Sequence, residues 1–257
     1  MPHWLRIVLV LLCLIITPMV SLAQGNYFGR NKVQYRDFKW EIISTPHFEI
    51  YYYQGEEEAA YDAARMAERS YNRLSHILKH QFSEKVPIIL YASHTDFQQT
   101  NVLSGFISEG TGGVTEFNKN RILLPFTGSY AELEHVLTHE LVHAFQGDIL
   151  YGAGPGVSIL NPMAFVAPLW FMEGMAEYLS LGLIDSYTHM WLRDAALQGY
   201  LPDSIPSMDY SFGVYRFGQA LFAYIGDRYG DRKIGEILMK TSEIRNVDDA
   251  FQAVIGK

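Results

Sequence analysis

Residues 130–150 read YAELEHVLTHELVHAFQGDIL, and they mark the point where the sequence changes from strand-like to helical. Apolar side chains recur here every three or four residues, the spacing of one face of an α-helix. They are Leu133, Val136, Leu137, Leu141, Ala144 and Phe145. Strand-like segments and one helical segment come before this stretch, and helical segments follow it. This order predicts an α+β fold.

The segments before residue 130 favour a mixed sheet with one helix. β-Branched and aromatic residues predict strands over 40–53, with a break at Thr45-Pro46, over 86–91 and over 114–126, with a turn at 118–120. An alanine-rich pattern predicts a helix over 56–80. The helices expected after residue 130 cover 130–150, 169–181, 187–199, 215–229, 231–240 and a segment from 248.

Composition restricts the class of protein. The chain has 257 residues, of which 49% are hydrophobic, so it can bury a full core. The net charge is −8 and the basic residues are not clustered, which argues against a nucleic-acid-binding surface. Cys13 is the one cysteine, so the sequence offers neither an internal disulfide nor a thiolate metal site.

The first 23 residues have the pattern of a secretory signal. A short basic start is followed by an apolar run over 7–16, and Ser21-Leu22-Ala23 supplies small residues at the positions that a signal peptidase reads. The run is shorter than the about 20 residues of a membrane span. We therefore expect cleavage of 1–23, no membrane span in the mature chain, and a periplasmic or extracellular domain over 24–257. The alternative is an uncleaved anchor.

The sequence His139-Glu140-Leu141-Val142-His143 carries the chemistry of the helical stretch. Two histidines four residues apart lie one turn above each other on a helix, so both imidazoles can point at one ion. Glu140 is rotated about 100° from His139 by the helix geometry. Its carboxylate is therefore expected beside the ion, where it can take a proton from a metal-bound water.

Residues 170–178, WFMEGMAEY, supply a third ligand. Glu173 and Glu177 lie four apart in an otherwise apolar helical segment, and a buried acid is costly unless it is paired or binds a metal. We expect Glu173 to coordinate the ion and Glu177 to hydrogen-bond a ligand histidine. Gly174 is expected to let this helix approach the histidine-bearing helix closely. The alternative for both acids is an exposed acidic stripe.

His135 lies one further turn before His139, but it is not expected to be a third histidine ligand. The eight residues from His135 to His143 rise about 12 Å along a helix, too far for both to meet one ion at about 2 Å.

Together, the two motifs resemble the gluzincin metallopeptidases, the set that includes thermolysin and the alanyl aminopeptidases. The closer resemblance is to the peptidase MA-like domains of exported bacterial proteins, which are commonly followed by TolB-like β-propeller repeats. The resemblance implies one zinc ion on His139, His143 and Glu173, with Glu140 as general base. It also implies a thermolysin-like fold, in which a sheet-rich part over about 24–128 and a helical part over about 129–257 enclose the metal cleft.

Residues 209–220 extend the resemblance. By likeness to the aminopeptidases, Tyr215 donates to the developing oxyanion and Tyr210 is an accessory residue; the alternative is that Tyr215 simply packs in the core. Two departures stand out. The gap of 29 residues between His143 and Glu173 is longer than in the aminopeptidases, and the stretch Gly113-Val-Thr-Glu116-Phe117 keeps little of their amine-binding motif. We expect the strand that this stretch begins, and that continues through Arg121–Leu124, to be the sheet edge that pairs with a peptide.

The sequence therefore predicts an exported zinc metallopeptidase that acts on peptides or proteins, with a downstream β-propeller in a longer parent chain. Two rival interpretations stay open. One is a catalytically inert zinc-binding scaffold in a cell-envelope assembly, although such a site needs no base. The other is a non-peptidase hydrolase with the same metal centre. The sequence does not indicate cleavage specificity, endo- or exopeptidase action, or oligomeric state.

Overall fold

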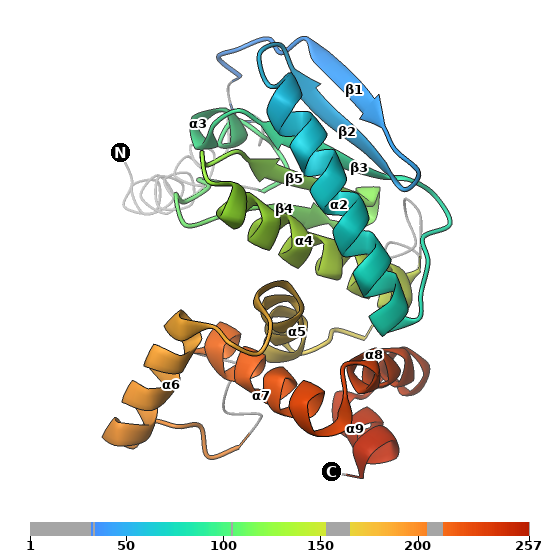
Figure 1. Cartoon of the computed structure of the whole chain (residues 1–257), viewed down its shortest axis with the longest axis vertical. Helices are drawn as coiled ribbons and strands as arrows, with labels where there is room; N and C mark the ends of the chain where they lie inside the picture. Colours follow the sequence, from blue (N-terminus) through green and yellow to red (C-terminus); the bar gives the residue numbers. More distant parts are fainter. Residues whose placement is uncertain (1–31, 33, 104, 153–164, 205–212, 257) are drawn as a thin grey trace, which may run out of the picture.

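A computed structural model describes residue 32 and residues 34–103, 105–152, 165–204 and 213–256. The first half of the chain forms a five-stranded mixed sheet and the second half is helical, as the sequence predicts (Figure 1). The strands are β1 (Trp40–Ser44), β2 (Phe48–Tyr53), β3 (Val86–Tyr91), β4 (Val114–Glu116) and β5 (Arg121–Pro125). The predicted signal segment, residues 1–23, lies outside the described residues.

The strand order in the sheet is β1-β2-β3-β5-β4. β2, β3 and β5 run parallel, whereas β1 and β4 pair antiparallel at the two edges. The predicted break at Thr45-Pro46 is the turn between β1 and β2, where the Thr45 amide donates to the Phe48 carbonyl at 2.9 Å. The predicted edge strand divides into β4 and β5: β4 is at the edge, but the expectation that the edge continues through Arg121–Leu124 is wrong. β5 is held between β3 and β4, because the turn at Phe117–Lys119 folds β4 back onto its outer side.

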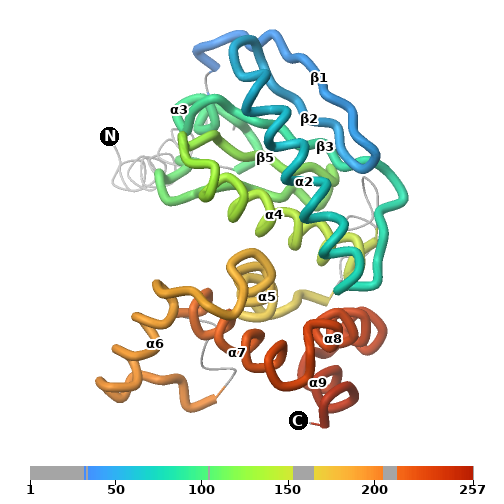
Figure 2. Tube along the Cα trace, viewed as in Figure 1, coloured from blue at the N-terminus to red at the C-terminus, as the bar shows by residue number. Residues whose placement is uncertain are grey.

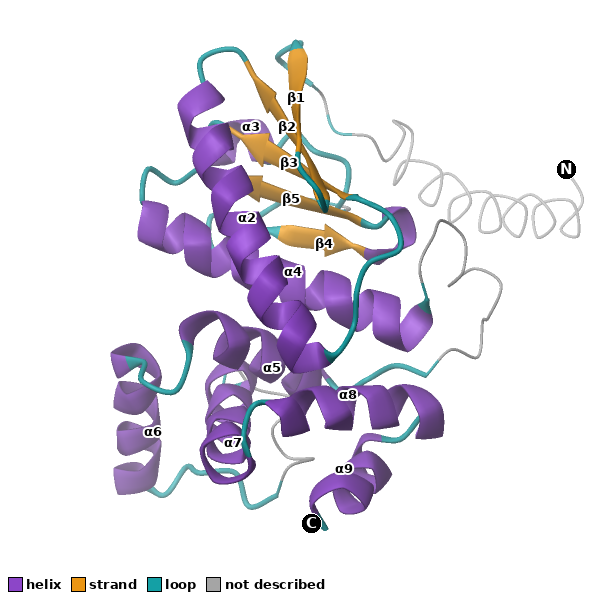
Figure 3. Cartoon of the chain, turned by 45° about the vertical axis from the view of Figure 1, so that its right-hand side comes forward, coloured by secondary structure: helices purple, strands orange, loops and turns teal. Residues whose placement is uncertain are grey.

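Two long helices, α2 (Glu57–Leu78) and α4 (Tyr130–Tyr151), cover one face of the sheet and pack against each other (Figure 3). Ser129 caps α4 by accepting from the Glu132 amide at 3.3 Å. The short helix α3 (His94–Phe97) was not expected, because four residues are too few to show a helical period.

The remaining helices form a further layer against α4 (Figure 2). They are α5 (Leu169–Leu181), α6 (Ser186–Gln198), α7 (Val214–Tyr229), α8 (Arg232–Ile244) and α9 (Val247–Ile255). One continuous hydrophobic core runs from Ile88 in the sheet through Leu141 of α4 to Phe222 of α7. None of the helices in the described part of the chain is long and apolar enough to cross a membrane.

Gly174 makes its close approach to a different helix from the one expected. A Cβ atom at Gly174 would lie 2.5 Å from the backbone of Gly218, so α5 and α7 touch backbone to backbone. The glycine therefore sets the spacing of α5 and α7, rather than that of α5 and α4.

Candidate metal centre

Helices α4 and α5 bring two imidazoles and one carboxylate together. The Nε2 atoms of His139 and His143 are 3.1 Å apart, and Glu173 Oε2 lies 3.1 Å from the first and 3.3 Å from the second. In a tetrahedral zinc site with bonds near 2.0–2.1 Å, ligand atoms are about 3.3–3.4 Å apart. These three residues could therefore hold one metal ion, in the arrangement that the spacing predicts.

A positive charge between the two imidazole nitrogens and the Glu173 carboxylate would stabilise the cluster, because all three groups can offer a lone pair there. Burial disfavours the charged imidazole of His139, but its hydrogen bond with Glu173 and the nearby carboxylates raise its pKa well above the usual value. Burial also disfavours the Glu173 carboxylate, but its hydrogen bond with His139 and the neighbouring imidazole of His143 lower its pKa. In the metal-free chain this raised pKa favours a proton on His139, which would supply the charge. A metal ion would replace that proton, since a ligand histidine must be neutral.

Glu177 stands behind His139, on the side away from the cluster. Its Oε1 lies 3.3 Å from His139 Nδ1, close enough for an ion pair, although the buried Nδ1 makes no aligned hydrogen bond with any described group. The expected contact between Glu177 and a ligand histidine is therefore present as an ion pair. The exposed acidic stripe, the alternative interpretation, is not what the structure shows, because Glu177 is 5% exposed.

A partly buried arginine, which the sequence did not indicate, holds Glu177 in turn. Arg216 Nη1 donates to Glu177 Oε2 at 2.9 Å and to Thr188 Oγ1 at 3.0 Å. Asp185 Oδ2 lies 3.6 Å away, and the guanidinium stacks over the Tyr187 ring at 4.9 Å. Burial raises the pKa of Glu177, but His139 and Arg216 outweigh burial and lower it. Glu177 is thus an ionised partner for His139.

Gln146 holds the other ligand histidine from behind. His143 Nδ1 lies 2.7 Å from Gln146 Oε1, and Gln146 Nε2 donates to the Met172 carbonyl of α5 at 3.0 Å. The sequence places Gln146 one turn beyond His143, which is a visible signal. Its partner across the helix interface could not be read from local spacing.

Glu140 is buried beside the ligand cluster and is held by the edge strand β4. Thr115 Oγ1 lies 2.7 Å from Glu140 Oε2 and 2.8 Å from the Glu140 carbonyl, so the hydroxyl can donate to either. Gly113 leaves room for this arrangement, because a Cβ there would come within 2.9 Å of Glu140 Cγ. The carboxylate is near the cluster but is not one of its three ligand groups, as the helix geometry predicts.

Comparison of the chain with protein-family models, with curated proteins and with solved structures found no match. The site is therefore interpreted from its own geometry.

Tyr215 and His135 lie near the cluster without joining it. Burial, together with the charges of Glu173, Glu177 and Glu140, raises the pKa of Tyr215 to about 12, so its hydroxyl stays protonated. His135 Nδ1 is 3.1 Å from the Ser180 hydroxyl, away from the ligand atoms. Tyr210, the predicted accessory residue, lies outside the described residues.

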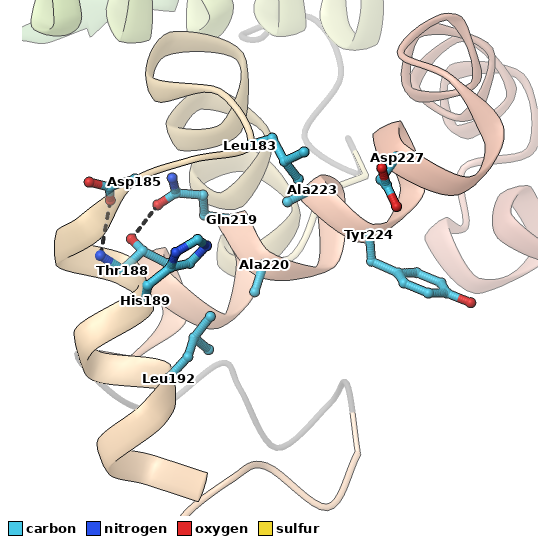
Figure 4. Close-up of a pocket in the computed structure, with 10 residues that line it drawn as sticks. All are labelled: Leu183, Asp185, Thr188, His189, Leu192, Gln219, Ala220, Ala223, Tyr224 and Asp227. Carbon is cyan, nitrogen blue, oxygen red and sulfur yellow. Dashed lines mark hydrogen bonds between the residues drawn. The ribbon is translucent and has the colours of Figure 1, made fainter.

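A pocket of about 220 Å³ lies between α6 and α7 (Figure 4). Its lining includes Thr188 and Gln219, which hydrogen-bond each other at 2.6 Å and are also the partners of Arg216. The described lining of the pocket contains none of the ligand groups, and Arg216 connects its Thr188 and Gln219 to Glu177 behind the metal centre.

Proposed function

We propose that this chain is an exported zinc-dependent peptidase domain of the gluzincin type, with a thermolysin-like arrangement of sheet and helices. The observation that carries the proposal is the convergence of His139, His143 and Glu173 from two helices, with Glu140 buried beside them. Two histidines and a glutamate leave a fourth position open, which is typical of catalytic rather than structural zinc sites. Export is proposed from the signal-like pattern of residues 1–23.

The donor set favours zinc as the ion. Imidazole nitrogens with one carboxylate suit zinc, whereas calcium and magnesium prefer sites made of oxygen ligands. When bound, zinc supplies Lewis acidity, which acidifies water and polarises a carbonyl group.

The residues around the ion have complementary tasks. Glu140 accepts the proton of the attacking water at its carboxylate and delivers it to the amine nitrogen as the peptide bond breaks. Thr115 fixes the position of that carboxylate through the 2.7 Å hydrogen bond. The neutral phenol of Tyr215 can donate to the carbonyl oxygen as negative charge develops on it.

The substrate we propose is an extended peptide. β4 is an edge strand, and its Thr115 contacts Glu140. A peptide that adds to this edge by main-chain hydrogen bonds would run past the general base. We therefore assign peptide pairing to β4, the first part of the edge strand that the sequence predicts, and not to Arg121–Leu124.

The test uses purified protein, elemental analysis and a quenched-fluorescence peptide library, with a chelator as inhibitor. Glu140→Gln should keep one zinc ion per chain and lower turnover by about 10²–10⁴-fold, the usual contribution of a general base. Glu134→Gln is the matched control, because Glu134 lies on the same helix and its side chain is 51% exposed. It should change neither quantity.

Undiminished turnover in Glu140→Gln would refute the role of Glu140, and a chain without bound metal would refute the peptidase. A zinc-loaded wild type that cleaves neither peptides nor casein would instead favour the inert scaffold. Hydrolysis of ester or other non-peptide bonds alone would favour the non-peptidase hydrolase.

A further inference from the structure

We propose that Gln146 is a positioning residue for the metal centre, which orients His143 and ties it to the helix that carries Glu173. The proposal rests on the metal centre of the proposed function. It concerns metal binding, however, and does not require that the bound ion catalyse peptide hydrolysis.

The Gln146 side-chain amide lies buried between α4 and α5. Gln146 is 0% exposed, and a buried amide is costly unless it is hydrogen-bonded. Both ends are satisfied, by His143 on the same helix and by the Met172 carbonyl on α5. The residue is thus a polar link between α4 and α5, next to the ligand groups that the same two helices carry.

The orientation of that amide follows from its two partners. A backbone carbonyl can only accept a hydrogen bond, so the group facing Met172 must be the amide nitrogen. The Gln146 oxygen must then face His143. Because that oxygen can only accept, His143 Nδ1 must be the donor and must carry the proton.

The tautomer of His143 decides which of its ring nitrogens can bind a metal. In a neutral imidazole with its proton on Nδ1, the Nε2 atom has a free lone pair. Nε2 is the atom that points at His139 and Glu173 in the ligand cluster. Gln146 therefore selects the form of His143 that can bind a metal, before any metal is present.

Gln146 is also connected to the third ligand, Glu173, through its hydrogen bond to Met172. Met172 directly precedes Glu173 in α5. One amide thus fixes the ring of one ligand and the backbone beside another, which lie on different helices. We expect it to set how well the site is preformed, because partners behind ligand histidines typically contribute about 10–100-fold to metal affinity.

The experiment compares zinc affinity in the wild type, Gln146→Leu and Gln99→Leu by competition with a chromogenic chelator. Gln99 is the matched control: it is also buried and hydrogen-bonded, to the Tyr35 amide at 2.8 Å, but it lies away from the metal centre. Gln146→Leu should weaken zinc binding by about 10–100-fold. Gln99→Leu should leave the zinc affinity unchanged, even if it lowers thermal stability as much.

A second measurement needs no variant and so does not depend on folding of Gln146→Leu. Long-range ¹H–¹⁵N NMR spectra of the metal-free wild type, at a pH where the imidazole is neutral, report which nitrogen of His143 is protonated. The proposal requires the proton on Nδ1. A proton on Nε2, or an unchanged zinc affinity in Gln146→Leu, would overturn it. Zinc binding that depends on Gln146 without any peptide hydrolysis would support this proposal and refute the peptidase.

Discussion

The contact between α5 and α7 allows a sharp test, because the two helices meet through glycine backbones. A Cβ at Gly174 would lie 2.5 Å from both the Cα and the carbonyl carbon of Gly218. Contacts under 3.0 Å are essentially never seen for a real Cβ, and ordinary contact begins at 3.4 Å. The helices must therefore separate by roughly 0.5–0.9 Å in Gly174→Ala, since a packed interface resists compression.

Gly147→Ala is the matched control for this substitution. Its Cβ would also meet an atom at 2.5 Å, but that atom belongs to the ring of Phe117, which is 42% exposed and can turn aside. Both changes are glycine to alanine within a helix, so the gain in helix propensity of about 1 kcal/mol is common to the two. The difference between them isolates the cost of overpacking, about 1–3 kcal/mol.

The assay is urea denaturation of the two metal-free variants, with the free energy of unfolding extrapolated to water. We expect Gly174→Ala to be less stable than Gly147→Ala by about 1–3 kcal/mol. We also expect weaker zinc binding in Gly174→Ala alone, because Glu173 moves with α5. Equal free energies of unfolding for the two variants would refute the inference that the Gly174–Gly218 contact sets the spacing of α5 and α7.

Three further predictions concern the ion, the proposed oxyanion donor and the sheet edge. Zinc at 100 times its dissociation constant should raise the free energy of unfolding by about 2.7 kcal/mol, and His143→Ala should abolish this gain; an unchanged denaturation midpoint with zinc would contradict the site. Tyr215→Phe should lower kcat by about 10²–10³-fold with little change in KM, whereas unaltered kinetics would indicate that Tyr215 only packs. Burial raises the pKa of Glu116, but hydrogen bonds from Lys119 and Arg121 outweigh it and lower the pKa. Its contribution to stability should therefore be complete above about pH 4.5 and decline as the pH falls below that value. Between about pH 6 and about pH 3, the free energy of unfolding should fall more with decreasing pH in the wild type than in Glu116→Gln. An equal fall in both would contradict this prediction.

The sequence predicted the parts of the candidate site that depend on local geometry. The positions of His139, Glu140 and His143 relative to one another follow from the helical period, and the apolar flanks show that the helix is buried. Glu173 could be chosen because an acid in an apolar segment needs a partner. The structure brings His139, His143 and Glu173 together as expected.

The residues that hold the ligands were harder to predict, because their partners are distant in sequence. Gln146 contacts Met172, Thr115 contacts Glu140, and Arg216 contacts Glu177, and the two residues of each pair differ by at least 25 in sequence position. Gln146 lies one turn beyond His143, but neither this spacing nor the sequence around Thr115 indicates which distant group each side chain contacts. Only the packing of α4 against β4 and α5 selects it.

By itself, therefore, the sequence determined the α+β order of elements and the spacing of ligands along each helix, since both depend on side-chain periods of two and 3.6 residues. Tertiary structure alone decided that β4, and not β5, is the edge, and that Gly174 faces α7. It also decided which buried polar groups stand behind each histidine. These features depend on which surfaces pack together, and a local period determines the direction of a side chain but not the neighbour it meets.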